Sequence, residues 1–229
     1  MKKIIVIPAY NEEGNLEKTV RDIRENAPDF DYVIVNDCST DNTLGMCREK
    51  GFSYLNLPVN LGIGGAVQTG YRYAYYHGYD LAVQFDGDGQ HSAKFLAQMA
   101  KVLEETESDM VIGSRFIEKE GFQSSGLRRI GTRYFSLLIK LLTGKTVTDP
   151  TSGMRMINRK LLKKFTNEYP KDYPEPESVV TVLSEKHKVT EIPVVMNERE
   201  EGISSISLRN SVYYMIKVSF AVVIARMKK

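Results

Sequence analysis

The chain has 229 residues, 42% of them hydrophobic and 26% charged, which is the balance of an ordinary globular protein with one domain core. The formal net charge of +2 gives no general affinity for polyanions, so a nucleic-acid partner is not expected. Two cysteines, Cys38 and Cys47, are too few for a disulfide framework or a cysteine metal site and are typical of a reducing compartment.

The amino-terminal apolar run is too short for a signal peptide and is followed at once by polar residues, so none is expected. No stretch of the sequence reaches the roughly 20 apolar residues that are needed to cross a bilayer.

Short apolar runs alternate with helical patterns through the first half of the chain. Buried strands are predicted at 4–7, 32–35, 52–57, 81–85 and 110–113. Helices are predicted at 13–26, from Ser39 or Thr40 to about 51, at 62–78 and at 93–106. This alternation predicts an α/β fold with a mostly parallel sheet flanked by helices, in which ligands bind at the carboxyl ends of the strands.

The second half of the chain is less regular. Loops are predicted at 116–126, 143–155 and 170–176, helices at 127–142 and 177–187, and a strand at 189–195. We expect one catalytic domain over residues 1–205, because no repeat or low-complexity linker interrupts it, and a separate carboxy-terminal segment over 206–229.

The carboxy-terminal segment has no acidic residue from 203 onward and carries several basic ones. As a helix, its apolar part at 212–225 would be about 21 Å long, shorter than the hydrocarbon core of roughly 30 Å. Two interpretations remain open. The helix lies in a membrane interface with its cations facing anionic lipid, or it is a core or oligomer helix.

Two carboxylates, Asp86 and Asp88, follow the predicted strand at 81–85 with glycines between and after them. Two adjacent charges are costly to bury, and hard oxygen ligands shared with phosphate oxygens suit Mg²⁺ or Mn²⁺. The motif is a candidate metal site, and the alternative is a solvated turn.

Polar residues also follow the first two strands. Tyr10 is placed to stack on a base and Glu12 to accept hydrogen bonds from base or ribose, while the alternative is a helix-capping loop with Asn11 as the cap. Asp37 is a candidate acceptor from the base edge, whereas Asp41 is expected in the first turn of a helix. The glycines at 62–65 permit close backbone approach to a ligand.

Taken in order, seven segments resemble the family-2 glycosyltransferases with the GT-A fold, and most closely the dolichol-phosphate mannose synthase-like branch. They are PAYNE at 8–12, VNDCSTD at 35–41, NLGIGGA at 60–66, DGDGQH at 86–91, GSR at 113–115, TDPTSGMR at 148–155 and an Arg-X-X-Gly-X-Ser motif at 199–204. Together they cover residues 3 to 205, and seven ordered matches are far more specific than any one. Cys38 stands where glycine is usual, and the absence of tryptophan makes a processive cellulose-synthase-like enzyme improbable.

The resemblance implies roles for individual residues. The metal, Mg²⁺ or Mn²⁺, would be held by Asp86 and Asp88, and Asp88 and Arg199 would take part in catalysis. The nucleotide would be held by Pro8, Ala9, Tyr10, Glu12, Asp37, Asn60, Gly65, Asp86 and Gly87. The diphosphate or the acceptor would be contacted by Gln90, Arg115, Arg128, Arg129, Arg199 and Ser204.

The implied reaction transfers a sugar, with inversion, from a UDP- or GDP-sugar to a polyprenyl phosphate or lipid-linked glycan in cell-envelope polysaccharide synthesis. Such an enzyme would work in the cytoplasm, peripherally at the inner face of the cell membrane, with a membrane surface, a small membrane protein or a second copy as a partner. A hydroxyl acceptor would need a general base, for which Glu175 and Glu177 are candidates unless one of them caps the following helix. His91 is a candidate ligand of metal or substrate, or a structural residue.

Two functions of other classes compete with this one. A non-catalytic nucleotide-sugar binding or scaffold subunit would recruit a membrane partner through its tail, but it has no need of paired metal-binding carboxylates. A nucleotidyltransferase would need a glycine-rich phosphate loop after the first strand, which the sequence lacks.

Overall fold

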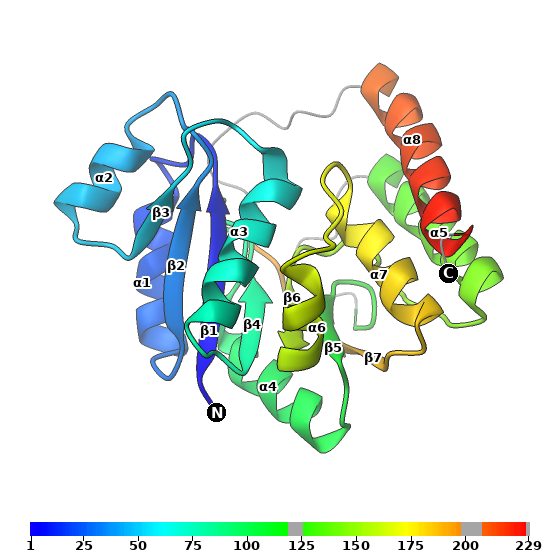
Figure 1. The fold of residues 1–229 in the computed structure, drawn as a ribbon. Coiled ribbons are helices and arrows are strands. Elements are labelled where there is room, and N and C mark those ends of the chain that lie inside the picture. The colour runs from blue at the N-terminus through cyan, green and yellow to red at the C-terminus, as the bar shows by residue number, and fades with distance from the viewer. Residues whose placement is uncertain (119–125, 198–207, 228–229) are drawn as a thin grey trace.

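The computed structural model describes residues 1–118, 126–197 and 208–227, and it has an α/β fold (Figure 1). Seven strands form one sheet in the order β3-β2-β1-β4-β6-β5-β7. The strands are β1 (Lys3–Ala9), β2 (Asp31–Asn36), β3 (Tyr54–Asn56), β4 (Leu81–Gln84), β5 (Met110–Ser114), β6 (Arg155–Asn158) and β7 (Val189–Pro193). Every neighbouring pair is parallel except the two pairs that β6 makes with β4 and β5, so the predicted mostly parallel sheet is confirmed.

Helices cover both faces of the sheet. They are α1 (Leu16–Asn26), α2 (Thr43–Glu49), α3 (Gly62–Tyr76), α4 (Leu96–Glu105) after the 3₁₀ turn η1 (Ala93–Phe95), α5 (Gly126–Thr143), α6 (Arg159–Phe165), α7 (Pro174–Ser184) and α8 (Leu208–Met227). One hydrophobic cluster joins the sheet to α1, α2 and α4, and the other joins it to α3 and α5 to α8. Ile4 and Val6 belong to one cluster, Ile5 and Ile7 to the other. This burial on both faces explains why β1 is a continuous apolar run.

Strand β6 and helix α6 were not predicted, and the helix predicted from 177 begins three residues earlier, at Pro174. Only Met156 and Ile157 in β6 carry large apolar side chains, which is too short a run to signal a strand. The strand nevertheless lies inside the sheet, between β4 and β5. Its backbone hydrogen bonds on both edges come from partners that are distant in the sequence.

Proline is accommodated inside β1 because its two neighbours differ in length. Pro8 pairs with Val35 of β2, whereas the pairing with β4 ends at Val6 and Gln84. The missing amide of Pro8 therefore removes no bond from the ladder with β4. Beyond Val6, β1 continues to Ala9 at the carboxyl edge of the sheet without pairing with β4.

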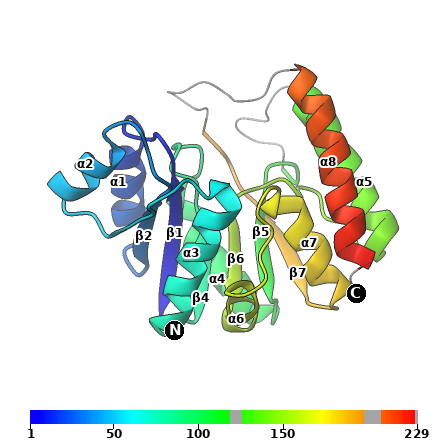
Figure 2. The same cartoon turned by 45° about the horizontal axis from the view of Figure 1, so that its top comes forward.

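Helix α8 packs beside α5 and α7, as the second view shows for α5 and α8 (Figure 2). Val218, Val222 and Ala225 are buried in the same cluster as Phe135 and Ile139 of α5. The hydroxyls of Tyr134 and Ser219 lie 2.9 Å apart, and Arg226 Nε donates to the Leu142 carbonyl at 2.9 Å. One side of the carboxy-terminal helix is therefore part of the protein core.

Among the described residues, no helix has both the length and the apolar character that a bilayer crossing requires.

Candidate active site

A pocket of about 400 Å³ opens where the strand order reverses, between β1 and β4. From β1 the chain moves outward to β2 and β3 and then returns to the other side of β1 as β4, which is the position where open α/β sheets bind ligands. The pocket is lined by Pro8, Ala9, Tyr10, Glu12, Asp37, Asn60, Gly62, Ile63, Ala66, Asp86, Gly87 and Asp88. All of the predicted nucleotide-binding residues except Gly65 are among them.

The loops after β1 and β2 are tied together through Asn11. Its side-chain oxygen accepts a hydrogen bond from the Thr40 backbone amide at 2.8 Å, and its backbone amide donates to Ser39 Oγ at 3.0 Å. Both Asn11, with φ of 57°, and Cys38, with φ of 59°, have left-handed backbones. The alternative of Asn11 as a helix cap is wrong, because α1 begins at Leu16, after Asn15.

Position 38 has a left-handed backbone, a conformation that favours glycine. An L-residue in this region costs about 1 kcal/mol or more, whereas glycine adopts it freely.

Asp37 is buried at 3% exposure and fixes the entry to α3. Its Oδ1 accepts a hydrogen bond from the Leu61 amide at 2.7 Å, and its carbonyl accepts one from Asn60 Nδ2 at 3.1 Å. The start of α3 is thereby held against the pocket. Gly65 faces Leu61 on the same helix, where an added Cβ would lie 2.4 Å from Leu61 Cβ. Gly65 is therefore not among the residues that line the pocket, whereas Gly62, Ile63 and Ala66 are.

The loop that carries Asp86 and Asp88 is held by His91. The imidazole is 4% exposed and packs edge-to-face on Phe85, and its Nδ1 accepts a hydrogen bond from the Asp86 amide at 2.9 Å. Burial lowers the pKa of His91 to about 4, so the ring is neutral at pH 7. In this position His91 holds the backbone of the loop through the Asp86 amide, which favours a structural role for His91.

A glycine from a distant loop packs against Asp86. A Cβ at Gly153 would lie 2.5 Å from Asp86 Oδ2 and 3.0 Å from Oδ1, so only glycine leaves room for the carboxylate. On the other side of the loop, the Gln90 amide donates to Asp88 Oδ1 at 3.1 Å, and the Gln90 carbonyl accepts from the Asn197 amide at 2.9 Å. The two carboxylates are thus held at the edge of the pocket by segments from three parts of the chain.

Beneath Asp86 lies a polar layer that includes Glu175. Gln84 Nε2 donates to Asp86 Oδ1 at 3.3 Å and to Glu175 Oε1 at 3.4 Å, and Tyr169 OH donates to Gln84 Oε1 at 3.4 Å. Burial raises the pKa of Glu175; the Arg155 guanidinium opposes this shift and the negative Asp86 adds to it. Glu175 is therefore linked to the candidate metal site through one side chain, that of Gln84. Both Glu175 and Glu177 lie in the first turn of α7.

Arg155 is a functional candidate that the sequence reasoning missed. The side chain is 1% exposed and donates to the Ser152 and Pro150 carbonyls, both at 2.6 Å, to Ser178 Oγ at 2.9 Å and to the Glu175 carbonyl. It thereby joins the loop that carries Gly153 to the start of α7. Its place at the end of the TDPTSGMR segment was the available signal.

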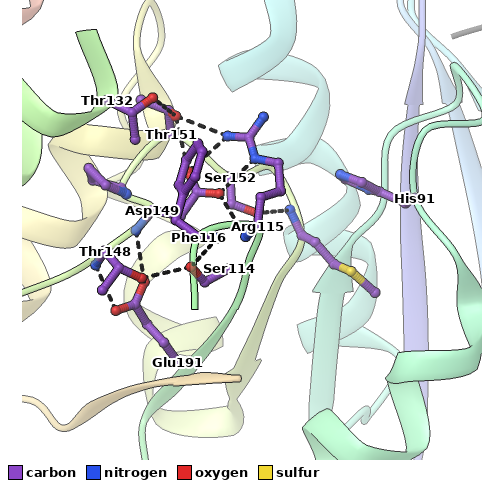
Figure 3. A network of polar contacts seen from close by, with 12 residues as sticks. His91, Ser114, Arg115, Phe116, Thr132, Thr148, Asp149, Thr151, Ser152 and Glu191 are labelled. Atoms are coloured by element: carbon purple, nitrogen blue, oxygen red, sulfur yellow. Dashed lines mark hydrogen bonds and ion pairs between the residues drawn. The ribbon is translucent and has the colours of Figure 1, made fainter. Parts of the chain in front are cut away.

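Arg115 forms a bidentate ion pair with the fully buried Asp149, with Nε and Nη2 donating at 2.7 and 2.8 Å (Figure 3). The network continues to Glu191, whose carboxylate accepts from the backbone amides of Thr148 and Asp149 at 2.7 and 2.9 Å. Figure 3 shows these contacts running from Glu191 at one end to Arg115 at the other. Arg115 thus holds the 148–155 loop onto the end of β5.

The remaining predicted residues are placed only in part. Arg129 is exposed near the start of α5, and the side chain of Arg128 beside it lies outside the described part of the structure, as do Arg199 and Ser204.

The donor set fits a divalent cation. Asp86 and Asp88 offer hard carboxylate oxygens at the pocket, and the Asp86 side chain is 34% exposed. Within residues 1–118, 126–197 and 208–227, no three His, Cys, Asp or Glu side chains gather around one point. A cation here would therefore complete its shell with donor phosphate oxygens and water, as Mg²⁺ and Mn²⁺ do at phosphate sites.

Comparison with known proteins agrees with this geometry. Residues 4–166 match the model of glycosyl transferase family 2, which is more than half of the chain, and the protein therefore belongs to that family. It is 30% identical to a UDP-N-acetylglucosamine–dolichyl-phosphate N-acetylglucosaminyltransferase of Methanococcus voltae over 210 residues, with 83% of each chain covered. It is 25% identical over 228 residues to a polyprenol monophosphomannose synthase of Mycolicibacterium smegmatis, with 95% of this chain and 86% of the relative covered.

Among solved structures, the fold is similar to glucosyl-3-phosphoglycerate synthase of Mycobacterium tuberculosis in complex with Mn²⁺, UDP and glucosyl-3-phosphoglycerate. The TM-score is 0.75 at 19% identity, with 98% of this chain and 79% of the other covered. At this identity the likeness shows the GT-A fold alone.

Proposed function

We propose that the protein transfers a sugar from a nucleotide-sugar donor to a polyprenyl phosphate or another lipid-linked acceptor, with inversion at the anomeric carbon. The observation that carries this proposal is the pocket at the β1–β4 switch point, whose rim brings Tyr10, Asp37 and the Asp86–Asp88 carboxylates together. The lipid acceptor is supported by the relatives that are named as dolichyl-phosphate and polyprenol-phosphate enzymes.

In this proposal the donor base lies by Tyr10 and Asp37, and the diphosphate lies toward Asp86 and Asp88. A Mg²⁺ or Mn²⁺ ion held there would offset the charge that develops on the leaving diphosphate. UDP is the first nucleotide to test, since the M. voltae relative is named for a UDP-sugar and the similar structure contains UDP; GDP is the second.

The acceptor decides whether a base is needed. A lipid phosphate is already an anionic nucleophile near pH 7, whereas a glycan hydroxyl must lose its proton. Glu175 is the better placed of the two candidate bases, since Gln84 connects it to Asp86. We assign Gln90, Arg115, Arg128, Arg129, Arg199 and Ser204 to the diphosphate or acceptor side as part of the proposal.

We also propose that residues 1–205 form the catalytic unit and that residues 206–229 help to bring it to the inner face of the cell membrane, where the acceptor would be presented. The lipid partner and this location are inferred from the relatives' acceptors and from the acid-free tail.

Calorimetric titration tests the donor site. We expect UDP and UDP-sugars to bind more tightly with Mn²⁺ than without it, and Asp88→Ala to remove the metal-dependent part. Asp29→Ala, an exposed carboxylate just before β2 at the opposite edge of the sheet, is the matched control. Binding that is independent of metal and unchanged by Asp88→Ala would contradict the proposed site.

Transfer is then assayed with a panel of UDP- and GDP-sugars against polyprenyl phosphate. Formation of a polyprenyl-phosphate sugar supports the proposed reaction. Donor binding without transfer to any lipid acceptor would favour the non-catalytic binding subunit instead.

A further inference from the structure

Helices α5 and α8 together present an apolar face to solvent. On α5 the exposed large hydrophobic side chains are Ile130 (61%), Tyr134 (40%), Leu137 (57%) and Leu141 (75%); on α8 they are Ile216 (53%), Phe220 (65%), Ile224 (48%) and Met227 (78%). At 100° per residue, each set of four falls within about 60–80° of its helix circumference, so each forms one stripe. We call these eight residues the α5–α8 face.

The two stripes belong to one surface because the helices that carry them are in direct contact. Tyr134 OH and Ser219 Oγ lie 2.9 Å apart near the middle of the pair, and Arg226 Nε reaches the Leu142 carbonyl near one end. The opposite sides of both helices are already buried in the core, through Phe135 and Ile139 on α5 and Val218 and Val222 on α8. The face is therefore outward-facing and without a partner among the described residues. Single exposed hydrophobic residues are common, but eight in two adjacent stripes mark an interaction site.

The charged side chains that α5 and α8 themselves carry all have one sign. Neither α5 nor α8 contains an acidic residue. Arg129, Arg133 and Lys140 are exposed on α5 and lie on one side of its stripe by helical spacing, and Lys217 is exposed on α8 next to its stripe. The face is thus an apolar strip with cations along its borders.

This pattern distinguishes between the two obvious occupants. A second copy of the chain packed through the same face would place these cations against each other with no carboxylate on either helix to balance them. An anionic lipid surface supplies negative charge, and its acyl boundary accepts the apolar stripes. Tyr134, with an apolar ring and a polar hydroxyl, suits the level of the headgroups.

We propose that the α5–α8 face docks the protein flat onto an anionic membrane leaflet, so that α5 forms half of the lipid-binding surface and the carboxy-terminal helix forms the other half. The inference rests on the proposed function for the choice of a lipid partner and deepens it by naming the surface. Arg115 follows β5, and Asn197 is bonded to Gln90, so both residues lie at the carboxyl edge of the sheet. In the described part of the chain, α5 is the next helix after Arg115 and α8 is the next helix after Asn197. Docking through this face would hold the pocket beside the surface that carries a lipid phosphate.

Vesicle flotation of the full-length chain tests the docking, with no acceptor or donor present. We expect binding to vesicles of phosphatidylcholine mixed with phosphatidylglycerol, and weaker binding to phosphatidylcholine alone or at high salt. Failure of the wild-type chain to float with anionic vesicles would overturn the proposal.

Substitutions then test each helix. Leu137→Ser with Leu141→Ser on α5 and, separately, Phe220→Ser with Ile224→Ser on α8 should each lower the partition coefficient by at least about tenfold. Arg133→Gln with Lys140→Gln should lower it by about fivefold per charge and reduce its salt dependence. The matched controls are Tyr76→Ser on α3, 76% exposed, and Lys94→Gln in η1, and neither should change the binding. If only the α8 variants lose binding, α5 is not part of the surface and the proposal fails.

Three further measurements separate the possible failures. Calorimetric UDP binding of the same variants should equal that of the wild type, which shows an intact fold and leaves the donor site outside the result. Sedimentation of the wild-type chain should show a monomer; a dimer that Leu137→Ser with Leu141→Ser dissociates would assign the face to a second copy and overturn lipid docking. Transfer to a lipid phosphate in detergent should survive in the docking variants. Absence of transfer by the wild-type chain in detergent would count against the proposed function and not against the surface.

Discussion

Gly153→Ala should displace a candidate metal ligand with a single methyl group. The added Cβ would lie 2.5 Å from Asp86 Oδ2, about 0.9 Å closer than the 3.4 Å at which ordinary contact begins. The carboxylate must rotate away or the 150–154 loop must shift, which costs about 1–2 kcal/mol of stability. Because Mg²⁺ and Mn²⁺ tolerate little error in ligand position, we expect the affinity for UDP in the presence of Mn²⁺ to fall at least about tenfold, or 1.4 kcal/mol.

The assay is calorimetric titration of UDP with and without Mn²⁺, together with thermal unfolding followed by circular dichroism. Binding without metal should change little, because the base end of the pocket is not touched. Gly131→Ala is the matched control: nothing lies within 4 Å of its added Cβ, and alanine inside α5 should raise stability by about 0.5–1 kcal/mol without affecting UDP. Wild-type affinity in a folded Gly153→Ala protein would refute the position or the role given to Asp86.

Three further substitutions test two positions near the carboxyl edge of the sheet and one, at Asp109, at the opposite edge. Arg115→Met leaves the buried Asp149 carboxylate without its guanidinium and should cost about 3 kcal/mol of the free energy of unfolding, measured in urea; a loss below 1 kcal/mol would mean that solvent replaces the arginine. Cys38→Gly relieves a left-handed backbone and should stabilise the protein by about 0.5 kcal/mol after the larger entropy of glycine in the unfolded chain is counted; a lower melting temperature would contradict the strain. Burial acts to raise the pKa of Asp109, but hydrogen bonds from Asn158, His187 and the Lys188 amide lower it below its ordinary value. The stabilising effect of the ionised Asp109 is therefore present above about pH 4 and is lost as the pH falls further. Asp109→Asn should lower the free energy of unfolding by about 1–2 kcal/mol at pH 7 and by less at about pH 3. Urea titrations at the two pH values measure this difference.

The order of strands and helices in the first half of the chain, and the pocket at their carboxyl edge, could be predicted from local pattern. Continuous β-branched runs such as the one in β1 signal a strand buried on both faces, and parallel strands align their carboxyl ends. This places Tyr10, Asp37 and Asp86 at one edge before any coordinates are known. The structure confirms that all three line one pocket.

Other features depend on contacts between distant segments, so local pattern did not reveal them. Gly153 and Asp86 are 67 positions apart in the chain, and nothing local to either shows that one makes room for the other. Arg155 was predicted at the end of a loop, but it begins a central antiparallel strand and holds α7 in place. Gln84 lies in the strand predicted at 81–85 and was not a candidate residue, yet it connects Asp86 to Glu175.

The carboxy-terminal helix shows the division between the two kinds of information. Its sequence determined that it is basic, free of acidic residues and has an apolar part at 212–225 that is too short to span a bilayer, because these are properties of composition and length. Whether such a helix is core or surface was decided by its packing: Val218 and Val222 are buried against the protein, while Phe220 and Ile224 face outward. Only the tertiary structure could set α5 beside it, because the partner of a helix is chosen by shape and contact across about 85 residues of intervening chain. The sequence thus determined the chemistry of the candidate pocket and of the carboxy-terminal helix, and the folded chain decided which distant residues complete each of them.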